Sequence, residues 1–378
     1  MVDQRAAWVA LALTPGIGPA RMKTLLSSCG SPDGARSAPF AFLCRLPGFS
    51  RAAATAVRTS QIETGQRVLD TIDAMGARCL LPEDPEYPSL LRAIPDPPQL
   101  LFVQGDIACL DRPAVAVVGS RNHSAYGADV ARRVAGGAGA AGLVVVSGMA
   151  RGLDAIAHEA GLDAGAGGIG VLGNGFGVIY PAANRGLYER IGREGLLVTE
   201  FPPGERPHAH SFPRRNRLIS GLARVTVVIE AAAGSGALIT ADAALEQGRE
   251  VMAVPGPITS PTSVGSNRLI RDGAEPLLEV EDLLAHYPEL ARVTTPTAVT
   301  APTALAASPA VVGRTPEETQ LLETIGTGTH LDHIAATMAQ PIGPLLAQLA
   351  QLELEGVVEQ LPGRIFRVTG NHSLSSRA

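Results

Sequence analysis

This chain of 378 residues contains few cysteines, a single lysine and no long apolar run. No stretch reaches about 18 uninterrupted apolar residues, so the sequence predicts no membrane span. Its four cysteines (Cys29, Cys44, Cys79 and Cys109) have no C-x-x-C spacing, which argues against a zinc site and favours free thiols in a reducing cytoplasm. Met1–Arg5 lacks a signal-peptide pattern, and we therefore expect a cytoplasmic protein.

Two common nucleotide-binding motifs are also missing. Gly119, at the end of an expected buried strand, is followed by Ser120 and Arg121, and the next glycine is Gly127, so no G-x-G-x-x-G fingerprint forms. No G-x-x-x-x-G-K-[ST] loop occurs in the chain. A nicotinamide-dependent oxidoreductase and a Walker-type nucleotide binder are therefore disfavoured, and we expect no cofactor.

The formal net charge is −5, which excludes a globally basic nucleic-acid binder and leaves a local basic patch as the route to such a partner. Lys23 is the only lysine among the 31 basic residues. Contacts to anions would therefore come mainly from the planar forks of arginine.

Residues 1–82 are interpreted as a helical domain with two similar segments, Leu13–Ala20 and Cys44–Arg51. Each contains a helix end, a Pro-Gly turn and the start of a new helix. This pattern resembles helix-hairpin-helix (SAM-like) modules, in which the N–H groups of the turn meet a nucleic-acid phosphate. A small helical bundle that uses the turns only for packing is the alternative. Basic residues near the turns keep the first interpretation open: Arg21, Lys23 and Arg51.

Residues 83–287 alternate between strand and helix patterns after a connector, Pro82–Pro98, that holds six prolines and cannot form a regular helix. The expected strands are Leu100–Val103, Val115–Val118, Leu143–Val146, Ile169–Leu172, Leu196–Thr199, Val225–Ile229 and Val251–Val254. Apolar strands separated by helices predict an α/β domain with a mostly parallel sheet that is covered on both faces. Ligands of such sheets bind beyond the carboxyl ends of the strands.

The segment Pro113–Gly127 is central to this domain. Its buried strand ends in the turn Gly119–Arg121, and Ser124 can cap the helix that follows. Backbone N–H groups and the helix dipole would favour an anion there, and an α/β crossover whose glycine serves only the turn is the alternative. Glycine and small-hydroxyl turns, with one acid, follow the later strands: Ser147-Gly148, Gly173–Gly175, Glu230 and Gly234–Gly236.

The stretch Glu205–Leu222 is rich in arginine. It holds Arg206, Phe212, Arg214, Arg215, Asn216 and Arg217 just before and within an expected helix start. Several cations this close repel one another unless an anion joins them, and a phenylalanine offers a stacking face for an unpaired base. A solvated basic face is the alternative. His208 and His210 have no third ligand at a suitable spacing, so no metal site is expected.

Val293–Val312 is rich in Thr, Ala and Pro, and residues 288–312 are interpreted as a disordered linker. Residues 313–370 show three helix patterns and a hairpin, which resembles a winged helix. Seven acidic residues face three arginines between Gly313 and Gly370, and this balance disfavours binding dominated by phosphate contacts. We therefore expect a protein-interaction or regulatory role for this domain.

Six motifs, in order between about Tyr87 and Leu284, resemble the DprA/Smf family of bacterial DNA-processing proteins. They are G-S-R (Gly119–Arg121), S-G-x-A-R-G-x-D (Ser147–Asp154), G-x-G-x-x-x-x-Y-P (Gly173–Pro181), F-P-x-R-N-R-x-I-S (Phe212–Ser220), S-G-x-L-I-T-A (Ser235–Ala241) and V-P-G (Val254–Gly256). The resemblance implies an extended Rossmann-like core, without enzymatic activity, that binds and protects incoming single-stranded DNA and forms a homodimer. It also implies loading of the recombinase RecA in natural transformation or repair, with a single-strand-binding protein as a further candidate partner.

The resemblance further implies a set of DNA-contacting positions. They are Gly119, Ser120, Arg121, Ser147, Gly148, Arg151, Gly152, Phe212, Arg214, Arg215, Asn216, Arg217, Ser220, Gly236 and Thr240. Many members of the family have a lysine directly after Tyr-Pro, whereas this chain has Ala182 there. Arg185 is the candidate replacement for that lysine.

A nucleotide-processing enzyme, such as a nucleoside-monophosphate glycosidase on a related fold, is the alternative function. Such enzymes resemble P-G-G-x-G-T-x-x-E at the later glycine turn, whereas Ala233–Thr240 lacks the paired glycines and the glutamate. Glu230 and Glu246 are the nearest acids, and a lone acid at a strand end is more often a capping group.

Overall fold

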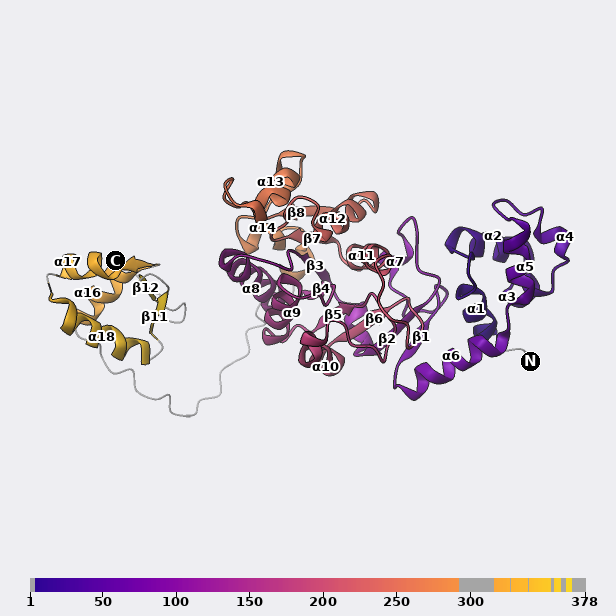
Figure 1. Cartoon of the computed structure of the whole chain (residues 1–378), viewed down its shortest axis with the longest axis horizontal. Helices are drawn as coiled ribbons and strands as arrows, with labels where there is room; N and C mark the ends of the chain where they lie inside the picture. The colour runs from indigo at the N-terminus through magenta and orange to yellow at the C-terminus, as the bar shows by residue number, and fades with distance from the viewer. Residues whose placement is uncertain are drawn as a thin grey trace. The chain divides into compact units, whose positions relative to one another are not determined.

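The computed structural model describes residues 4–291, 316–326, 328–338, 340–354, 357–361 and 365–368. The chain divides into two units, Met1–Thr297 and Ala298–Ala378 (Figure 1). The first four residues of the expected linker form a short helix, α15 (Pro288–Ala291), and the rest of that linker lies outside the described residues. No helix within the described ranges has both the length and the apolar character that a bilayer crossing needs.

The first unit begins with a domain of six helices. They are α1 (Gln4–Ala12), α2 (Pro19–Cys29), α3 (Pro32–Ser37), α4 (Phe40–Leu43), α5 (Arg51–Thr59) and α6 (Ile62–Ala74). Serine caps start two of them, because Ser31 accepts from Gly34 N at 3.0 Å and Ser50 accepts from Ala53 N at 3.2 Å. Their apolar faces enclose a core that includes Trp8, Leu25, Leu43, Val57 and Ile72. The helices of the two expected turn segments therefore belong to one small bundle.

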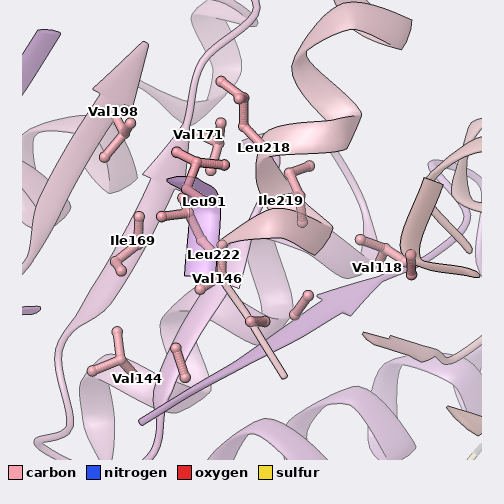
Figure 2. Packing of buried hydrophobic residues seen from close by; sticks show 14 of the residues in the cluster. Leu91, Val118, Val144, Val146, Ile169, Val171, Val198, Leu218, Ile219 and Leu222 are labelled. Carbon is pink, nitrogen blue, oxygen red and sulfur yellow. The ribbon is translucent and has the colours of Figure 1, made fainter. Parts of the chain in front are cut away.

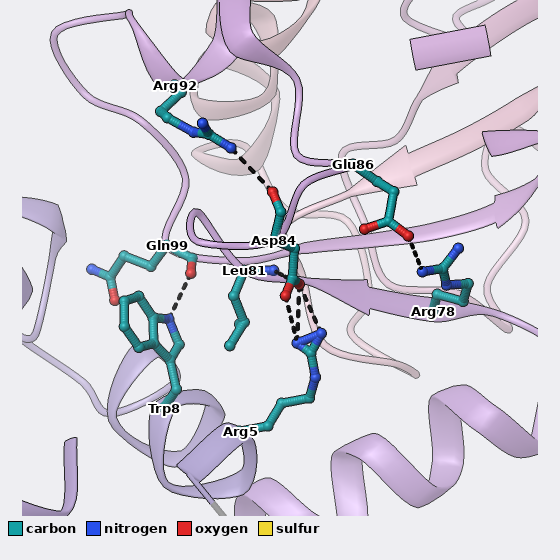
Figure 3. Close-up of polar contacts among 8 residues, drawn as sticks. All are labelled: Arg5, Trp8, Arg78, Leu81, Asp84, Glu86, Arg92 and Gln99. Carbon is teal, nitrogen blue, oxygen red and sulfur yellow. Dashed lines mark hydrogen bonds and ion pairs between the residues drawn. The ribbon is translucent and has the colours of Figure 1, made fainter. Parts of the chain in front are cut away.

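Polar contacts fix this helical domain to the segment that follows it (Figure 3). Arg5, on α1, donates to both oxygens of Asp84, at 2.7 and 3.0 Å to Oδ2 and 3.3 Å to Oδ1. The indole of Trp8 donates to the carbonyl of Gln99 at 2.8 Å. The proline-rich connector contains only one short helix, α7 (Ser89–Arg92), and the phenol of Tyr87 donates to the carbonyl of Pro98 at 2.7 Å. Side-chain bonds thus hold a connector that has little regular structure.

A nine-stranded sheet forms the centre of the first unit, in the order β1-β2-β6-β5-β4-β3-β7-β8-β9. The strands are β1 (Arg78–Leu80), β2 (Leu101–Gly105), β3 (Ala114–Val118), β4 (Val144–Ser147), β5 (Gly168–Val171), β6 (Leu196–Thr199), β7 (Val225–Val228), β8 (Glu250–Ala253) and β9 (Glu275–Pro276). Only the pairs β1–β2 and β2–β6 are antiparallel. The expected mostly parallel α/β fold is confirmed. The two outermost strands were not expected, and β1 begins before the expected domain boundary at residue 82.

Helices cover both faces of this sheet. They are α8 (Ala125–Ala140), α9 (Leu153–Asp163), α10 (Arg185–Glu194), α11 (Ser211–Gly221), α12 (Gly236–Glu246), α13 (Val264–Arg271) and α14 (Val280–Leu284). Residues alternate along β3, so that Ala116 and Val118 pack with α11 and α12 while Val115 and Val117 pack with α8 and α9. Figure 2 shows Leu218 and Ile219 of α11, and Leu222 directly after it, lying over the strand side chains. This packing fixes the arginine-rich helix on the sheet.

The second unit has the elements of a winged helix. They are α16 (Pro316–Ile325), β10 (Thr329–His330), α17 (Leu331–Met338), α18 (Ile342–Leu354), β11 (Val358–Leu361) and β12 (Ile365–Val368). Strands β11 and β12 pair antiparallel, and β12 also pairs with β10. Leu321, Ile334, Leu349 and Phe366 are buried in its core. The expected winged-helix architecture is confirmed, and the residues that connect the two strands of the expected hairpin, 362–364, lie outside the described residues.

Candidate functional site

The order in which the chain adds strands to the sheet reverses at β3. The chain runs from β3 outward through β4 and β5 to β6, and it returns on the other side of β3 as β7. Open parallel sheets bind ligands at such a reversal, beyond the carboxyl ends of the strands. A hollow of about 460 Å³ lies there, between the turn Gly119–Asn122 after β3 and the turn Gly234-Ser235 with the first residue of α12, Gly236. A smaller hollow adjoins it, lined by Gly148–Arg151, Asn174 and Tyr180.

The two hollows share Arg121, Ala150, Phe212 and Arg215, and together we call them the strand-end groove. Phe212 is at its centre. The guanidinium carbons of Arg121 and Arg215 lie 5.6 Å and 6.0 Å from the ring centroid. The half-exposed ring of Tyr180 lies 5.7 Å from that of Phe212, at an angle of 41°. The groove therefore combines cations with two aromatic faces, which suits a chain of phosphates and unpaired bases.

Arg215 is almost completely buried, with 4% of its surface exposed. It donates to the carbonyls of Gly148 and, at 2.7 Å, of Val171, and its Nε donates to Asn216 at 3.1 Å. Burial lowers the pKa of Arg215 to about 10, while nearby Asp154 acts in the opposite direction. The guanidinium is still charged at neutral pH, so it contributes a fixed positive charge and holds the β4 and β5 ends together.

The side chain of Asp154 holds the turn after β4 through hydrogen bonds to the backbone. Asp154 accepts from the backbone N–H groups of Gly148 at 3.2 Å and Ala150 at 3.4 Å. Burial raises the pKa of Asp154, and the charge of Arg215 opposes that rise. Gly152 has φ 83°, and a Cβ there would lie 2.6 Å from the carbonyl oxygen of Ser120. Glycine is thus required where the β3 and β4 turns meet.

Arg121 and Arg151 are the exposed cations of the groove. Among the residues that the structure describes, neither forms an ion pair with a carboxylate. Arginine forks without a protein partner are the groups that match phosphate oxygens. The exposed Arg185, the expected replacement for the missing lysine, starts α10. Neither Arg185 nor Ala182 lines the groove.

The start of α8 differs from the expected anion site. Ser124 caps the helix as expected, with its Oγ accepting from Gly127 N at 3.0 Å. The carboxylate of Glu230 accepts from the Ser124 backbone N–H at 2.9 Å and from its hydroxyl at 2.6 Å. A Cβ on Gly127 would lie 2.3 Å from Glu230 Oε2. The Glu230 carboxylate therefore takes the place of an external anion at the start of α8. Glu230 acts as a helix cap, as expected for a lone acid at a strand end.

Arg214 and Arg217 line a different hollow from Arg215, next to the turn Thr14–Pro19 of the helical domain. Arg217 donates to the buried Glu200 at 2.6 Å and its Nε lies 3.3 Å from Asp96. Arg214 Nε lies 3.1 Å from Glu200, and its guanidinium lies over the ring of Phe201. The structure thus brings together Arg121, Arg151, Phe212 and Arg215, and it places Arg214 and Arg217 with acids elsewhere.

The remaining expected site residues have identifiable positions. Gly119, Ser120, Asn216, Gly236 and Thr240 line the larger hollow. Asn216 donates to the Gly236 carbonyl at 3.2 Å. Ser147 is buried and donates to the Val117 carbonyl at 2.6 Å, and Ser220 is also buried. Tyr180 and Asn174 were not selected from the sequence, although both belong to the Gly173–Pro181 motif that could have indicated them.

Within the described part of the chain, no group of three or more His, Cys, Asp or Glu side chains could hold a metal ion. The fold and the groove define an α/β protein with an extended Rossmann-like sheet, a cationic and aromatic crevice at its switch point, and separate helical and winged-helix parts. Comparison with known proteins narrows this class to one family.

The sequence model described as "DNA recombination-mediator protein A" matches residues 78–288, and that of the "DprA winged helix domain" matches residues 301–364. Protein Smf of Escherichia coli (strain K12) is 40% identical over 292 residues, which are 76% of this chain and 77% of the relative. The X-ray structure of DNA processing protein A (DprA) from Streptococcus pneumoniae is similar with a TM-score of 0.66 and 34% identity, over 74% of this chain and 97% of that one. A Helicobacter pylori DprA structure, which concerns a single-stranded DNA binding mode, has a TM-score of 0.52 and 28% identity, over 56% of this chain and 96% of that one.

The chain therefore belongs to the DNA recombination-mediator protein A (DprA/Smf) family, as the six motifs indicated. Its function is that of a DNA-processing recombination mediator.

Proposed function

We propose that the strand-end groove binds single-stranded DNA. The observation that carries this proposal is the cluster of Arg121, Phe212 and Tyr180 above the buried Arg215. Arginine forks would hold phosphates, the backbone N–H groups of the turns would donate to further phosphate oxygens, and the two rings would stack on bases without sequence preference. Unpaired bases are required because stacked, paired bases do not present their faces to a side chain.

We further infer that the bound strand is protected and passed to the recombinase RecA, in natural transformation or repair, and that the protein has no enzymatic activity of its own. Glu230, the acid at the end of β7, is used as a helix cap, which supports binding over base-releasing catalysis. The four thiols are free, which suits a reducing cytoplasm that also holds these partners.

A homodimer formed through the Rossmann-like domain is part of this proposal. Ile258 is 93% exposed and Leu278 is 74% exposed, and they follow β8 and β9 at one edge of the sheet. Large apolar side chains at such exposure are typical of an interaction surface when they gather at one edge. Sedimentation of the Ile258→Asp/Leu278→Asp variant should show a monomer where the parent chain forms a dimer.

The test of the main proposal is a mobility shift with matched single- and double-stranded oligonucleotides, compared at each of several stated salt concentrations. We expect preferential retardation of the single strand, with an affinity that falls as salt increases. An equal or stronger affinity for the duplex would contradict the role assigned to the groove. An assay for base release from nucleoside monophosphates serves as the control for the enzymatic alternative, and we expect no release.

A further inference from the structure

The helical domain carries a second concentration of positive charge, far along the chain from the groove residues. Residues 14–62 contain six basic side chains (Arg21, Lys23, Arg36, Arg45, Arg51 and Arg58) and one acidic side chain (Asp33), a formal balance of +5. The whole chain carries −5, so the other residues together carry −10. Asp33 lies 3.7 Å from Arg36, so the one acid of this segment faces an internal partner. A segment with this excess of positive charge in an acidic protein favours an anionic partner.

The two Pro-Gly turns of this domain lie side by side. Arg21 donates from Nε to the carbonyl of Gly48 at 2.8 Å and from Nη1 to that of Gly16 at 2.5 Å. Its guanidinium also lies 5.9 Å from the centroid of the Phe49 ring. Arg21 therefore works as a structural bridge, and it joins the starts of α2 and α5 into one end of the bundle. Both helices point their positive dipole ends toward this region.

Aromatic rings are exposed at the same end. Phe40 and Phe42, in the four-residue helix α4, are 36% and 41% exposed. The guanidinium of Arg51, the first residue of α5, lies 5.5 Å from the Phe40 centroid. Arg45 is exposed in the turn between these helices, and neither arginine has an ion-pair partner among the described residues. We call Phe40, Phe42, Arg45 and Arg51 the helical-domain surface.

We propose that the helical-domain surface is a second contact for single-stranded DNA, which binds a part of the strand that the groove does not reach. Exposed rings next to unpaired arginine forks are the combination that accepts bases on the rings and phosphates on the cations. An apolar protein partner would match the rings but would leave the arginines without anions. The inference shares its ligand with the proposed function, but it concerns different residues.

The experiment compares the full chain with two variants, Phe40→Ala/Phe42→Ala and Arg45→Ala/Arg51→Ala, on oligothymidylates of increasing length. Strands too short to reach beyond the groove should bind the parent and both variants equally. Long strands should bind each variant about tenfold more weakly. The salt dependence of log K on long strands should flatten by roughly 0.7 for each arginine that loses a phosphate.

Arg67→Ala is the matched control, because Arg67 is an exposed arginine on α6 that bonds within its own helix. Arg67→Ala should leave the affinity for short strands and the affinity for long strands unchanged. Phe40 and Phe42 should also form photo-crosslinks to a thymine analogue within a long strand. Unchanged affinity of both variants on long strands would overturn the inference and would point to a protein partner for this surface.

Failure of this inference can be told apart from failure of the proposed function. Arg121→Ala, in the groove, should weaken binding of short and long strands alike. If Arg121→Ala has no effect while the helical-domain variants lose affinity, the groove proposal fails and the second contact stands. Equal losses on short and long strands by the helical-domain variants would contradict the second contact.

Discussion

The guanidinium carbon of Arg121 lies 5.6 Å from the centroid of the Phe212 ring, although Arg121 follows β3 and Phe212 is the second residue of α11. This contact joins the first strand-end turn to the arginine-rich helix. It leaves the outer nitrogens of Arg121 available, because the arginine has no carboxylate partner in the described structure. Arg121 and Phe212 are thus pre-positioned as one cation and one stacking face.

We predict that Arg121→Ala weakens single-stranded DNA binding about tenfold and reduces the slope of log K against log salt by roughly 0.7, as for one lost phosphate contact. Arg121→Lys keeps the charge but loses the planar fork, so we expect an intermediate affinity with the slope nearly retained. Fluorescence anisotropy titrations at several salt concentrations measure both quantities. A slope unchanged in Arg121→Ala would mean that this arginine contacts no phosphate.

Arg217 should behave differently from Arg121. It is bonded to Glu200, whose side chain is only 4% exposed, and removing Arg217 leaves this buried charge with Arg214 alone, whose side chain is 58% exposed, as its ion-pair partner. We expect Arg217→Ala to lower the free energy of unfolding by about 3 kcal/mol, while single-strand affinity of the folded protein stays within twofold. Chemical denaturation and anisotropy measure the two effects separately.

The double variant Glu200→Gln/Arg217→Met is the control for this pair. It removes both charges, so much of the lost stability should return. A large loss of affinity in Arg217→Ala with normal stability would instead show that the ion pair opens for DNA.

The difference between these arginines shows what the sequence could and could not predict. Apolar runs bounded by glycine turns predicted seven of the strands and the mostly parallel sheet, because a strand buried on both faces needs such a run. The outermost strands β1 and β9 were missed because three and two residues are too few for a pattern. Strands this short at the edge of a sheet form because a neighbouring strand pairs with them.

Side-chain roles within the arginine-rich stretch could not be predicted for a related reason. Arg214, Arg215 and Arg217 are neighbours in sequence, but successive positions on a helix face different directions. The carbonyls of Gly148 and Val171 that bind Arg215, and the acid Glu200 that binds Arg217, belong to other strand ends. Such partners appear only when the sheet order is known.

His158 should make the protein sensitive to mild acid. It is fully buried on α9, and burial lowers its pKa to about 4 from an ordinary value near 6.5. A group whose pKa is depressed by folding contributes stability above its unfolded pKa, and that contribution is lost as pH falls toward the folded pKa. We therefore expect a loss of about 2 kcal/mol between pH 7.5 and pH 5 from this residue.

The measurement compares urea unfolding of the parent chain and His158→Leu at both pH values. The variant removes the titrating group, so its stability should fall less over the same interval, whatever its packing costs at pH 7.5. Parallel loss of stability in both chains would show that another group dominates the acid sensitivity.

Gly65 should tolerate no side chain, because α1 and α6 meet at this position. A Cβ there would lie 2.0 Å from the carbonyl oxygen of Ala6. We expect Gly65→Ala to destabilise the helical domain by about 1–3 kcal/mol, since backbone atoms must move apart. The single tryptophan, Trp8, is on α1, so its fluorescence reports unfolding of this domain.

Gly186→Ala is the control for that substitution. Gly186 is helical in α10, and a Cβ would meet nothing within 4 Å. Alanine there should be neutral or stabilising by up to about 1 kcal/mol. A Gly65→Ala variant as stable as this control would mean that the two helices can separate without cost.

The winged-helix unit should contribute little to DNA affinity. Its third helix, α18, contains no Arg or Lys and ends near Glu353, which is exposed. Phosphate contacts dominate the affinity of duplex binders, so a helix without cations makes a poor DNA-recognition helix. We predict that a chain ending at residue 297 binds single-stranded and duplex oligonucleotides as the full chain does, within twofold. Anisotropy with both ligands tests this, and a selective loss of duplex affinity on truncation would assign duplex binding to the winged helix after all.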